Sequence, residues 1–197
     1  MRTSIPGARR APLRFAALAL LLFACAGPAE IASEETLLTI GDFELIDHEG
    51  QPFRLSSLRG RPVLLFFGYT HCPDACPTMM SKLAVAYRNA GPEAKAIPTL
   101  FVSVDPRDTP PALKEYLSYF AIPARGLTGS KETIDEVVQK FAAHYTITPG
   151  DSEAGPYVDH TLTLYVLDKE GNVRELFDPT SKPEAIAAAM NAELKRG

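Results

Sequence analysis

The sequence lacks internal repeats, low-complexity segments, any long apolar run and any excess of positive charge, and it has only three cysteines. Without repeats, a chain of 197 residues fits a leader and one domain of roughly 150 to 170 residues. The apolar stretch at residues 15–24 is too short to span a bilayer as a mature helix. The formal net charge of −4 gives no electrostatic basis for binding nucleic acid.

The first 24 residues predict an export signal, because a basic stretch precedes the apolar one. A twin-arginine signal is an alternative, but Ala11 and Pro12 stand where such signals usually have a polar residue and then Phe, so we expect the general secretory route. Removing residues 1–24 takes the net charge from −4 to −8, because this segment has no acidic residue and four arginines, Arg2, Arg9, Arg10 and Arg14.

The segment Leu22-Phe23-Ala24-Cys25 is similar to the bacterial lipobox, in which the cysteine becomes the lipidated first residue of the mature protein. Phe23 departs from the small or β-branched residue that is usual there. The alternative is ordinary cleavage after Ala24-Cys25-Ala26, which would release a soluble protein. We favour lipidation of Cys25, followed by a flexible tether at residues 25–36 and a folded domain at residues 37–197.

The patterning of the domain predicts a thioredoxin-like α/β fold, with a central mixed sheet flanked by helices and an added N-terminal hairpin. Strands are expected at residues 43–45, 52–54, 61–67, 98–104, 161–167 and 173–177. Helices are expected at residues 79–89, 110–119 and 131–143, and a final helix is expected after the capping box Ser181-Lys182-Pro183-Glu184.

Cys72 and Cys76 directly follow the apolar strand in the run FFGYTHCPDACP. Near the first turn of a helix, residues four apart would share one helical face and have Cβ atoms roughly 5 to 6 Å apart. This spacing suits a bridging metal ion at least as well as a disulfide. A helix N-terminus also favours the thiolate form. Because Cys25 is either lipidated or removed with the signal, these two are the only thiols of the exported domain. They must form a disulfide, a metal site, or a pair that alternates between the two.

His160 is the predicted third ligand. Val158-Asp159-His160 stands before a predicted strand, where thioredoxins carry a cis-proline beside their redox pair. A single histidine before a strand is more often structural, but the paired cysteines and the missing proline reverse this expectation. Two thiolates and one imidazole suit three-coordinate Cu(I), whereas structural zinc usually has four protein ligands. Asp159 could orient the imidazole or adjust the charge of the site, or it could simply face solvent.

The other histidines are weaker candidates. His71 is next to Cys72, but adjacent residues on a turn point apart, so we expect it to tune local charge or to pack rather than to bind metal. His48 lies in a predicted hairpin turn and His144 at a predicted helix end, and both are expected to be structural or exposed.

Two further groups have a structural explanation as well as a functional one. Met79 and Met80 could serve as soft copper ligands, but methionine at helical spacing usually belongs to the core. Asp105, Arg107 and Asp108 are expected to brace a loop and cap the helix that follows, or alternatively to meet a partner protein.

Four motifs at consistent spacing resemble the Sco family, also called SenC, of copper chaperones for cytochrome c oxidase assembly. The resemblance covers residues 40 to 180 and implies a thioredoxin-like protein, tethered to the extracytoplasmic (periplasmic) side of the cell membrane, that binds one copper ion through Cys72, Cys76 and His160. It also implies an upstream copper donor and, as partner, cytochrome c oxidase subunit II, whose binuclear copper site the family helps to build. A monomer is expected. The motifs are GYTHCPDACP, VDPRDTP, GLTGS and VDHT.

Two functional hypotheses from different classes follow. The first is a copper metallochaperone, for which a reversible Cys72–Cys76 disulfide would provide a means of releasing the metal. The second is a thiol-disulfide oxidoreductase that reduces the cysteines of the oxidase subunit or of other exported proteins. A peroxidase of the same fold is weaker, because its Pro-x-x-x-Thr-x-x-Cys arrangement is absent before Cys72.

Overall fold

The computed structural model describes residues 36–150 and 156–196 of the chain. The predicted export signal, the lipidated Cys25 and the tether lie outside the described residues and stay predictions. Within those ranges, none of the helices has both the length and the apolar character that a membrane-spanning helix requires.

A mixed sheet of seven strands, in the order β2-β1-β5-β4-β3-β8-β9, forms the centre of the domain. Strands β3, β4 and β5 run parallel to one another, whereas β1–β2, β1–β5, β3–β8 and β8–β9 pair antiparallel. The predicted fold class, including the N-terminal β1–β2 hairpin, is confirmed. The strands are β1 Glu44–Asp47, β2 Pro52–Arg54, β3 Val63–Gly68, β4 Thr99–Ser103, β5 Ala124–Thr128, β8 Leu164–Leu167 and β9 Val173–Phe177.

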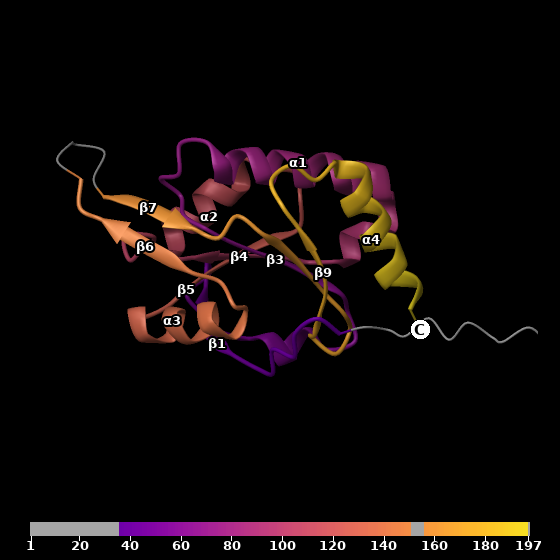
Figure 1. Ribbon diagram of the computed structural model, residues 1–197, viewed down its shortest axis with the longest axis horizontal. Coiled ribbons are helices and arrows are strands. Elements are labelled where there is room, and N and C mark those ends of the chain that lie inside the picture. Colours follow the sequence, from indigo (N-terminus) through magenta and orange to yellow (C-terminus); the bar gives the residue numbers. More distant parts are fainter. Residues whose placement is uncertain (1–35, 151–155, 197) are drawn as a thin grey trace, which may run out of the picture. The chain divides into compact units, whose positions relative to one another are not determined.

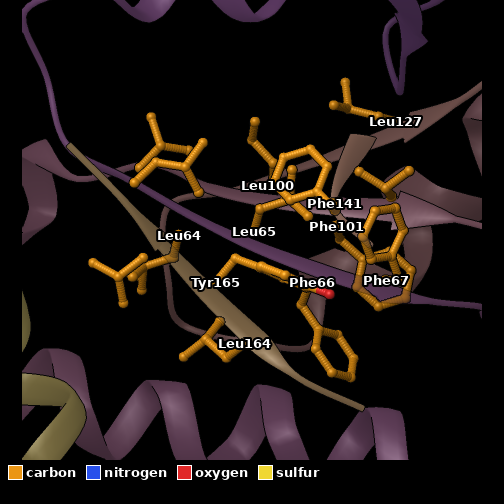
Figure 2. Packing of buried hydrophobic residues seen from close by; sticks show 14 of the residues in the cluster. Leu64, Leu65, Phe66, Phe67, Leu100, Phe101, Leu127, Phe141, Leu164 and Tyr165 are labelled. Carbon is orange, nitrogen blue, oxygen red and sulfur yellow. The ribbon is translucent and has the colours of Figure 1, made fainter. Parts of the chain in front are cut away.

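Strand β3 is the predicted central strand, and all six of its residues are buried, as expected for a strand covered on both faces. Its side chains alternate between the two faces (Figure 2). Phe66 packs against Phe101 on the face that carries α1, and Phe67 makes edge contacts with Phe141 and Tyr165 on the other face. The end of β3 is therefore fixed from both sides, and the cysteine loop begins there.

Helices α1, α2 and α4 lie on one side of the sheet and α3 lies on the other (Figure 1). Helices α1 and α2 each connect two neighbouring parallel strands, and right-handed crossovers place both on the same face. Helix α4 packs along α1. The helices are α1 Ala75–Ala90, α2 Pro110–Ser118, α3 Lys131–Lys140 and α4 Pro183–Lys195, with short 3-10 helices η1 Leu55–Leu58 and η2 Pro92–Ala96.

Three strands were not predicted. Strand β5 has Arg125 and Gly126 at its centre, a composition that does not indicate a strand. Strands β6, Tyr145–Thr148, and β7, Tyr157–His160, form a separate antiparallel ribbon. The strand predicted from residue 161 begins instead at Leu164. His160 therefore does not precede a core strand; it is the last residue of β7.

Two predicted helix starts also differ from the structure. Helix α1 begins at Ala75, four residues before the predicted start at Met79. The predicted capping box is wrong: Lys182 occupies the N-cap of α4 without a side-chain hydrogen bond, while the Ser181 hydroxyl donates to Asp178. Pro183 at the first helical position supplies the start instead, because its fixed φ suits a helix and its missing N–H needs no partner there.

Candidate metal centre

Cys72, Cys76 and His160 meet beyond the carboxyl end of β3. Their Sγ, Sγ and ring-nitrogen atoms all lie within 4.8 Å of one another. Cys76 is in the first turn of α1, but Cys72 lies in the loop before it, so the two do not share a helical face as predicted. The backbone N–H of Cys76 instead donates to Cys72 Sγ over 3.4 Å, so the start of α1 holds both sulfurs. This is a donor set that could hold one soft metal ion.

The three side chains differ in their access to solvent. Cys76 is completely buried and His160 is 6% exposed, whereas Cys72 is half-buried. A cavity of about 170 Å³ opens at this point, and Cys72 and His160 both line it. A metal ion or a partner's thiol would therefore meet Cys72 first.

The ring of His160 is oriented by its neighbours. Its Nδ1 lies 3.0 Å from the carbonyl oxygen of Thr161, and because a carbonyl can only accept, Nδ1 must carry the proton of this bond. In the neutral imidazole Nε2 then presents its lone pair, and Nε2 lies 3.6 Å from Cys76 Sγ. The rings of Phe66 and Tyr69 meet the imidazole edge to face. The side chain is thus held in the form that binds metals.

The two thiols differ in pKa. The hydrogen bond from the Cys76 thiol lowers the pKa of Cys72 far below its ordinary value, although burial opposes this, and the backbone N–H of Cys76 lowers the pKa further. The same bond to Cys72, together with burial, raises the pKa of Cys76. The first thiolate of the pair therefore forms at Cys72, the more exposed sulfur.

A buried carboxylate braces the cysteine loop. Asp108 accepts hydrogen bonds from the backbone N–H of Thr70 over 2.8 Å, from the Thr70 hydroxyl over 2.5 Å and from the Ser103 hydroxyl over 2.7 Å. The predicted role in bracing the loop is confirmed, but the predicted cap is not, because Thr109 occupies the N-cap of α2. His71 lies 3.5 Å from Asp108, is exposed and is not among the residues that line the cavity with Cys72 and His160.

Asp105 and Arg107 connect this loop to the ribbon that carries His160. The guanidinium of Arg107 binds both carboxylate oxygens of Asp105 and donates to the carbonyl oxygen of Pro156, next to β7. Burial alone would raise the pKa of Asp105, but the hydrogen bonds and charge of Arg107 hold it below its usual value. His71, Asp105 and Asp108 also form a group of possible ligands, yet their carboxylates are already bound to Arg107, Thr70 and Ser103.

Comparison with known proteins decides the family. The family model described as SCO1/SenC matches residues 31–195. The chain belongs to the SCO1/SenC family. An SCO2-like protein of Rickettsia conorii is 36% identical over 162 residues, which cover 81% of this chain and 79% of that protein.

Solved structures of the Sco family agree with the fold. The structure of Bradyrhizobium japonicum ScoI, solved with copper bound, is 36% identical, with a TM-score of 0.71 over 78% of this chain and 98% of that one. An SCO1/SenC family lipoprotein from Bacillus anthracis is 26% identical, with a TM-score of 0.67 over 79% of this chain and 94% of that one.

The remaining candidates of this Sco family chain lie outside the cluster of two sulfurs and an imidazole. His48 Nδ1 accepts from the backbone N–H of Gly126, and His144 pairs with the hydroxyl of Thr161. Asp159 is exposed at the mouth of the cavity, while the Thr161 carbonyl occupies the position that orients the imidazole. Met79 and Met80 are buried in the core, as predicted.

Two residues at this site were not predicted from the sequence. Tyr69 is buried and lines the cavity with Cys72 and His160. Gly68, the last residue of β3, has no room for a side chain: a Cβ there would lie 2.7 Å from the ring of Phe101 and 2.9 Å from Cys76 Sγ. Their position directly before Thr70-His71-Cys72 was the only available signal, because neither residue type is itself a metal ligand of this class.

Proposed function

We propose that this protein is a copper metallochaperone that holds one Cu(I) ion through Cys72, Cys76 and His160. The observation that supports this is the meeting of two sulfurs and a correctly oriented imidazole nitrogen within 4.8 Å. The copper bound to the related B. japonicum protein agrees with it. Two soft thiolates and one imidazole suit Cu(I), and residues 36–150 and 156–196 add no fourth ligand to this group, whereas structural zinc usually has four protein ligands.

The different exposure of the three proposed ligands suits a protein that carries copper and releases it. Cys76 and His160 would bind the ion from inside, where water cannot compete, and Cys72 would bind it at the surface, where an incoming ligand can replace it. Met79 and Met80 remain in the core and Asp159 would act only through its charge. A transfer by exchange of ligands at Cys72 therefore needs no large rearrangement of the fold.

The proposed recipient is subunit II of cytochrome c oxidase, since the family consists of copper-binding proteins of cytochrome c oxidase assembly. The proposed place of action is the extracytoplasmic side of a bacterial membrane, where a lipid on Cys25 would anchor the protein and an upstream donor would supply copper. The B. anthracis lipoprotein of the same family supports the anchor.

The alternative function is reduction of a disulfide in that subunit. The lowered pKa of Cys72 and the raised pKa of Cys76 favour it as a second candidate. The Cys72 thiolate would attack one sulfur of the target disulfide and expel the other as a thiolate. Cys76 would then lose its proton and attack Cys72 Sγ, which leaves a Cys72–Cys76 disulfide and a reduced target. The two electrons gained by the target come from the two cysteines.

One experiment separates the two functions. The copper-loaded protein is mixed with the soluble copper domain of subunit II, supplied either reduced or as its disulfide, and both copper and free thiols on the target are measured. Delivery predicts that copper moves to the reduced target and that His160→Ala abolishes the transfer. If the protein reduces the disulfide target, and His160→Ala does so as well as the unchanged protein, the oxidoreductase hypothesis replaces the chaperone.

A further inference from the structure

A second cavity, of about 540 Å³, lies away from the metal centre. The second half of α1, the 3-10 helix η2 and the loop that connects α2 to β5 enclose it. Cys76 stands in the first turn of α1, and Arg88, which lines the cavity, lies roughly 18 Å further along the helix axis. The two sites are therefore at opposite ends of one helix, and none of the three proposed copper ligands lines this cavity.

The walls of this cavity are mainly apolar. Tyr87 contributes its ring, because its hydroxyl donates to the carbonyl oxygen of Ile97 over 2.7 Å and lies 2.8 Å from the hydroxyl of Thr99. Phe120 and Ile122, in the loop after α2, are half-buried and line the cavity with Tyr87. Small-molecule sites typically have volumes of about 300 to 1,000 Å³ and apolar walls with a few polar groups. The cavity has the size and the lining of such a site.

The charged residues of the lining are Arg88 and Lys95, and both are cations. In the part of the chain that the structure describes, neither has an ion-pair partner, and no acidic residue lines the cavity. The sequence as a whole has 24 acidic and 20 basic residues, so the charge here is opposite in sign to that of the molecule. The carbonyl end of α1 offsets at most about half a charge, and the cavity therefore keeps a net positive charge.

We propose that this cavity binds a small amphipathic carboxylate. Its apolar body would lie against the rings of Tyr87 and Phe120 and the side chain of Ile122, and its carboxylate would pair with Arg88 and Lys95. A guanidinium presents a planar pair of donors that matches a carboxylate. An uncharged ligand would leave both cations unmatched and a cationic one would be repelled, so the charge of the lining selects an anion. The inference does not rest on the proposed function.

The test uses octanoate as the probe and 1-octanol as an uncharged molecule of the same chain length. Each is titrated into the full, metal-free chain, and binding is followed residue by residue through the amide signals of residues 84–95 and 120–123 in nuclear magnetic resonance spectra. The double variant Arg88→Met, Lys95→Met removes the two charges and keeps long apolar side chains. Lys140→Met is the matched control, because Lys140 is an exposed cation at the end of α3, on the other side of the sheet (Figure 1).

We expect octanoate to shift the amides around the cavity and to bind more tightly than octanol. The double variant should weaken octanoate binding about 5- to 30-fold, the size of two exposed charge pairs, and should leave octanol binding unchanged. Lys140→Met should change neither. Ala84→Leu, which adds side-chain volume to the cavity wall, should weaken the binding of both probes.

Three results would overturn the inference. The first is the absence of saturable shifts around the cavity with octanoate. The second is octanol binding as tight as that of octanoate, which would mean that the cations play no part in recognition. The third is an equal effect of the double variant and of Lys140→Met, which would mean that any exposed cation acts in the same way.

Discussion

His160 Nε2 lies 3.6 Å from Cys76 Sγ, although the two residues are 84 positions apart in the chain. The pair depends on two elements that belong to different parts of the fold: α1, which follows the central strand β3, and β7, which belongs to the two-stranded ribbon with β6. The site therefore exists only once the ribbon has packed over the start of α1. Binding of metal here must stabilise the folded state, because the unfolded chain has no such site.

Gly68→Ala is expected to disturb the sulfur of Cys76. The added Cβ would lie 2.7 Å from the ring of Phe101 and 2.9 Å from Sγ, so one of these buried groups must move. Overpacking of this kind costs about 1 to 3 kcal/mol of the free energy of unfolding. Both the free energy of unfolding, measured by chemical denaturation, and the affinity for Cu(I) should decline. A variant with unchanged stability and affinity would show that the close approach is relaxed in solution.

Asp108→Asn is expected to loosen the cysteine loop. The amide cannot accept from both Thr70 donors and Ser103 as the carboxylate does, so at least one buried group loses its partner, at a cost of about 1 to 3 kcal/mol. The measurement is the free energy of unfolding together with hydrogen exchange of the Thr70 amide. Asp74→Asn is the matched control, because this carboxylate is exposed in the same loop. Equal effects of the two changes would contradict the role of Asp108.

Metal-free, reduced protein is expected to react with iodoacetamide first at Cys72. The Cys76 thiol lowers the pKa of Cys72, while its own pKa is raised by the same bond and by burial, and only the thiolate is nucleophilic. The fully buried Cys76 should react at a measurable rate only when the protein unfolds. Peptide mass spectrometry of a time course near neutral pH follows each site. Equal rates at both cysteines would disprove the assignment of the thiolate.

Low pH is expected to weaken the contact between the loop that contains Asp105 and Arg107 and the β6–β7 ribbon. Hydrogen bonds and charge from Arg107 lower the pKa of Asp105 in the folded protein despite its burial. A carboxyl group with a lowered folded pKa stabilises the protein fully above its unfolded value of about 3.9, and this contribution is lost as pH falls through the folded value.

The comparison of unfolding free energy between the unchanged protein and Asp105→Asn tests this pH dependence. The difference should be constant from about pH 6 to 7 and should shrink below about pH 4, where the unchanged protein also loses the charge. A difference that stays constant down to pH 2 would mean that the charge of Asp105 contributes nothing to stability.

Much of the fold could be predicted because its strongest patterns are local. The all-apolar run in β3 indicates a buried strand, and the alternating helical and extended segments around it indicate an α/β fold. The ribbon could not be predicted in the same way. Tyr157–His160 alternates between exposed and buried residues over only four positions, and its partner Tyr145–Thr148 is equally short, so neither carries enough periodicity to be recognised.

In the site, too, residues that are close in sequence could be predicted, whereas contacts between distant segments could not. Cys72 and Cys76 are close in sequence and could be paired from spacing, although the predicted shared helical face was wrong because α1 begins only at Ala75. The approach of His160 depends on the ribbon, which the sequence does not reveal. The contacts of Tyr69 and Gly68 are tertiary in the same sense, since they depend on where β7 and Phe101 lie.

His160 and the two cysteines are proposed to form one copper site. The most direct test is an anaerobic titration of the reduced protein with Cu(I) against a competing chelator, alongside His160→Ala and the control His71→Ala, whose imidazole is next to Cys72 but faces solvent. We expect one tight site, with affinity reduced by more than the roughly 10- to 100-fold typical of lost supporting contacts in His160→Ala and nearly unchanged in His71→Ala. Weak binding by the unchanged protein, or tight binding indifferent to His160, would contradict the account.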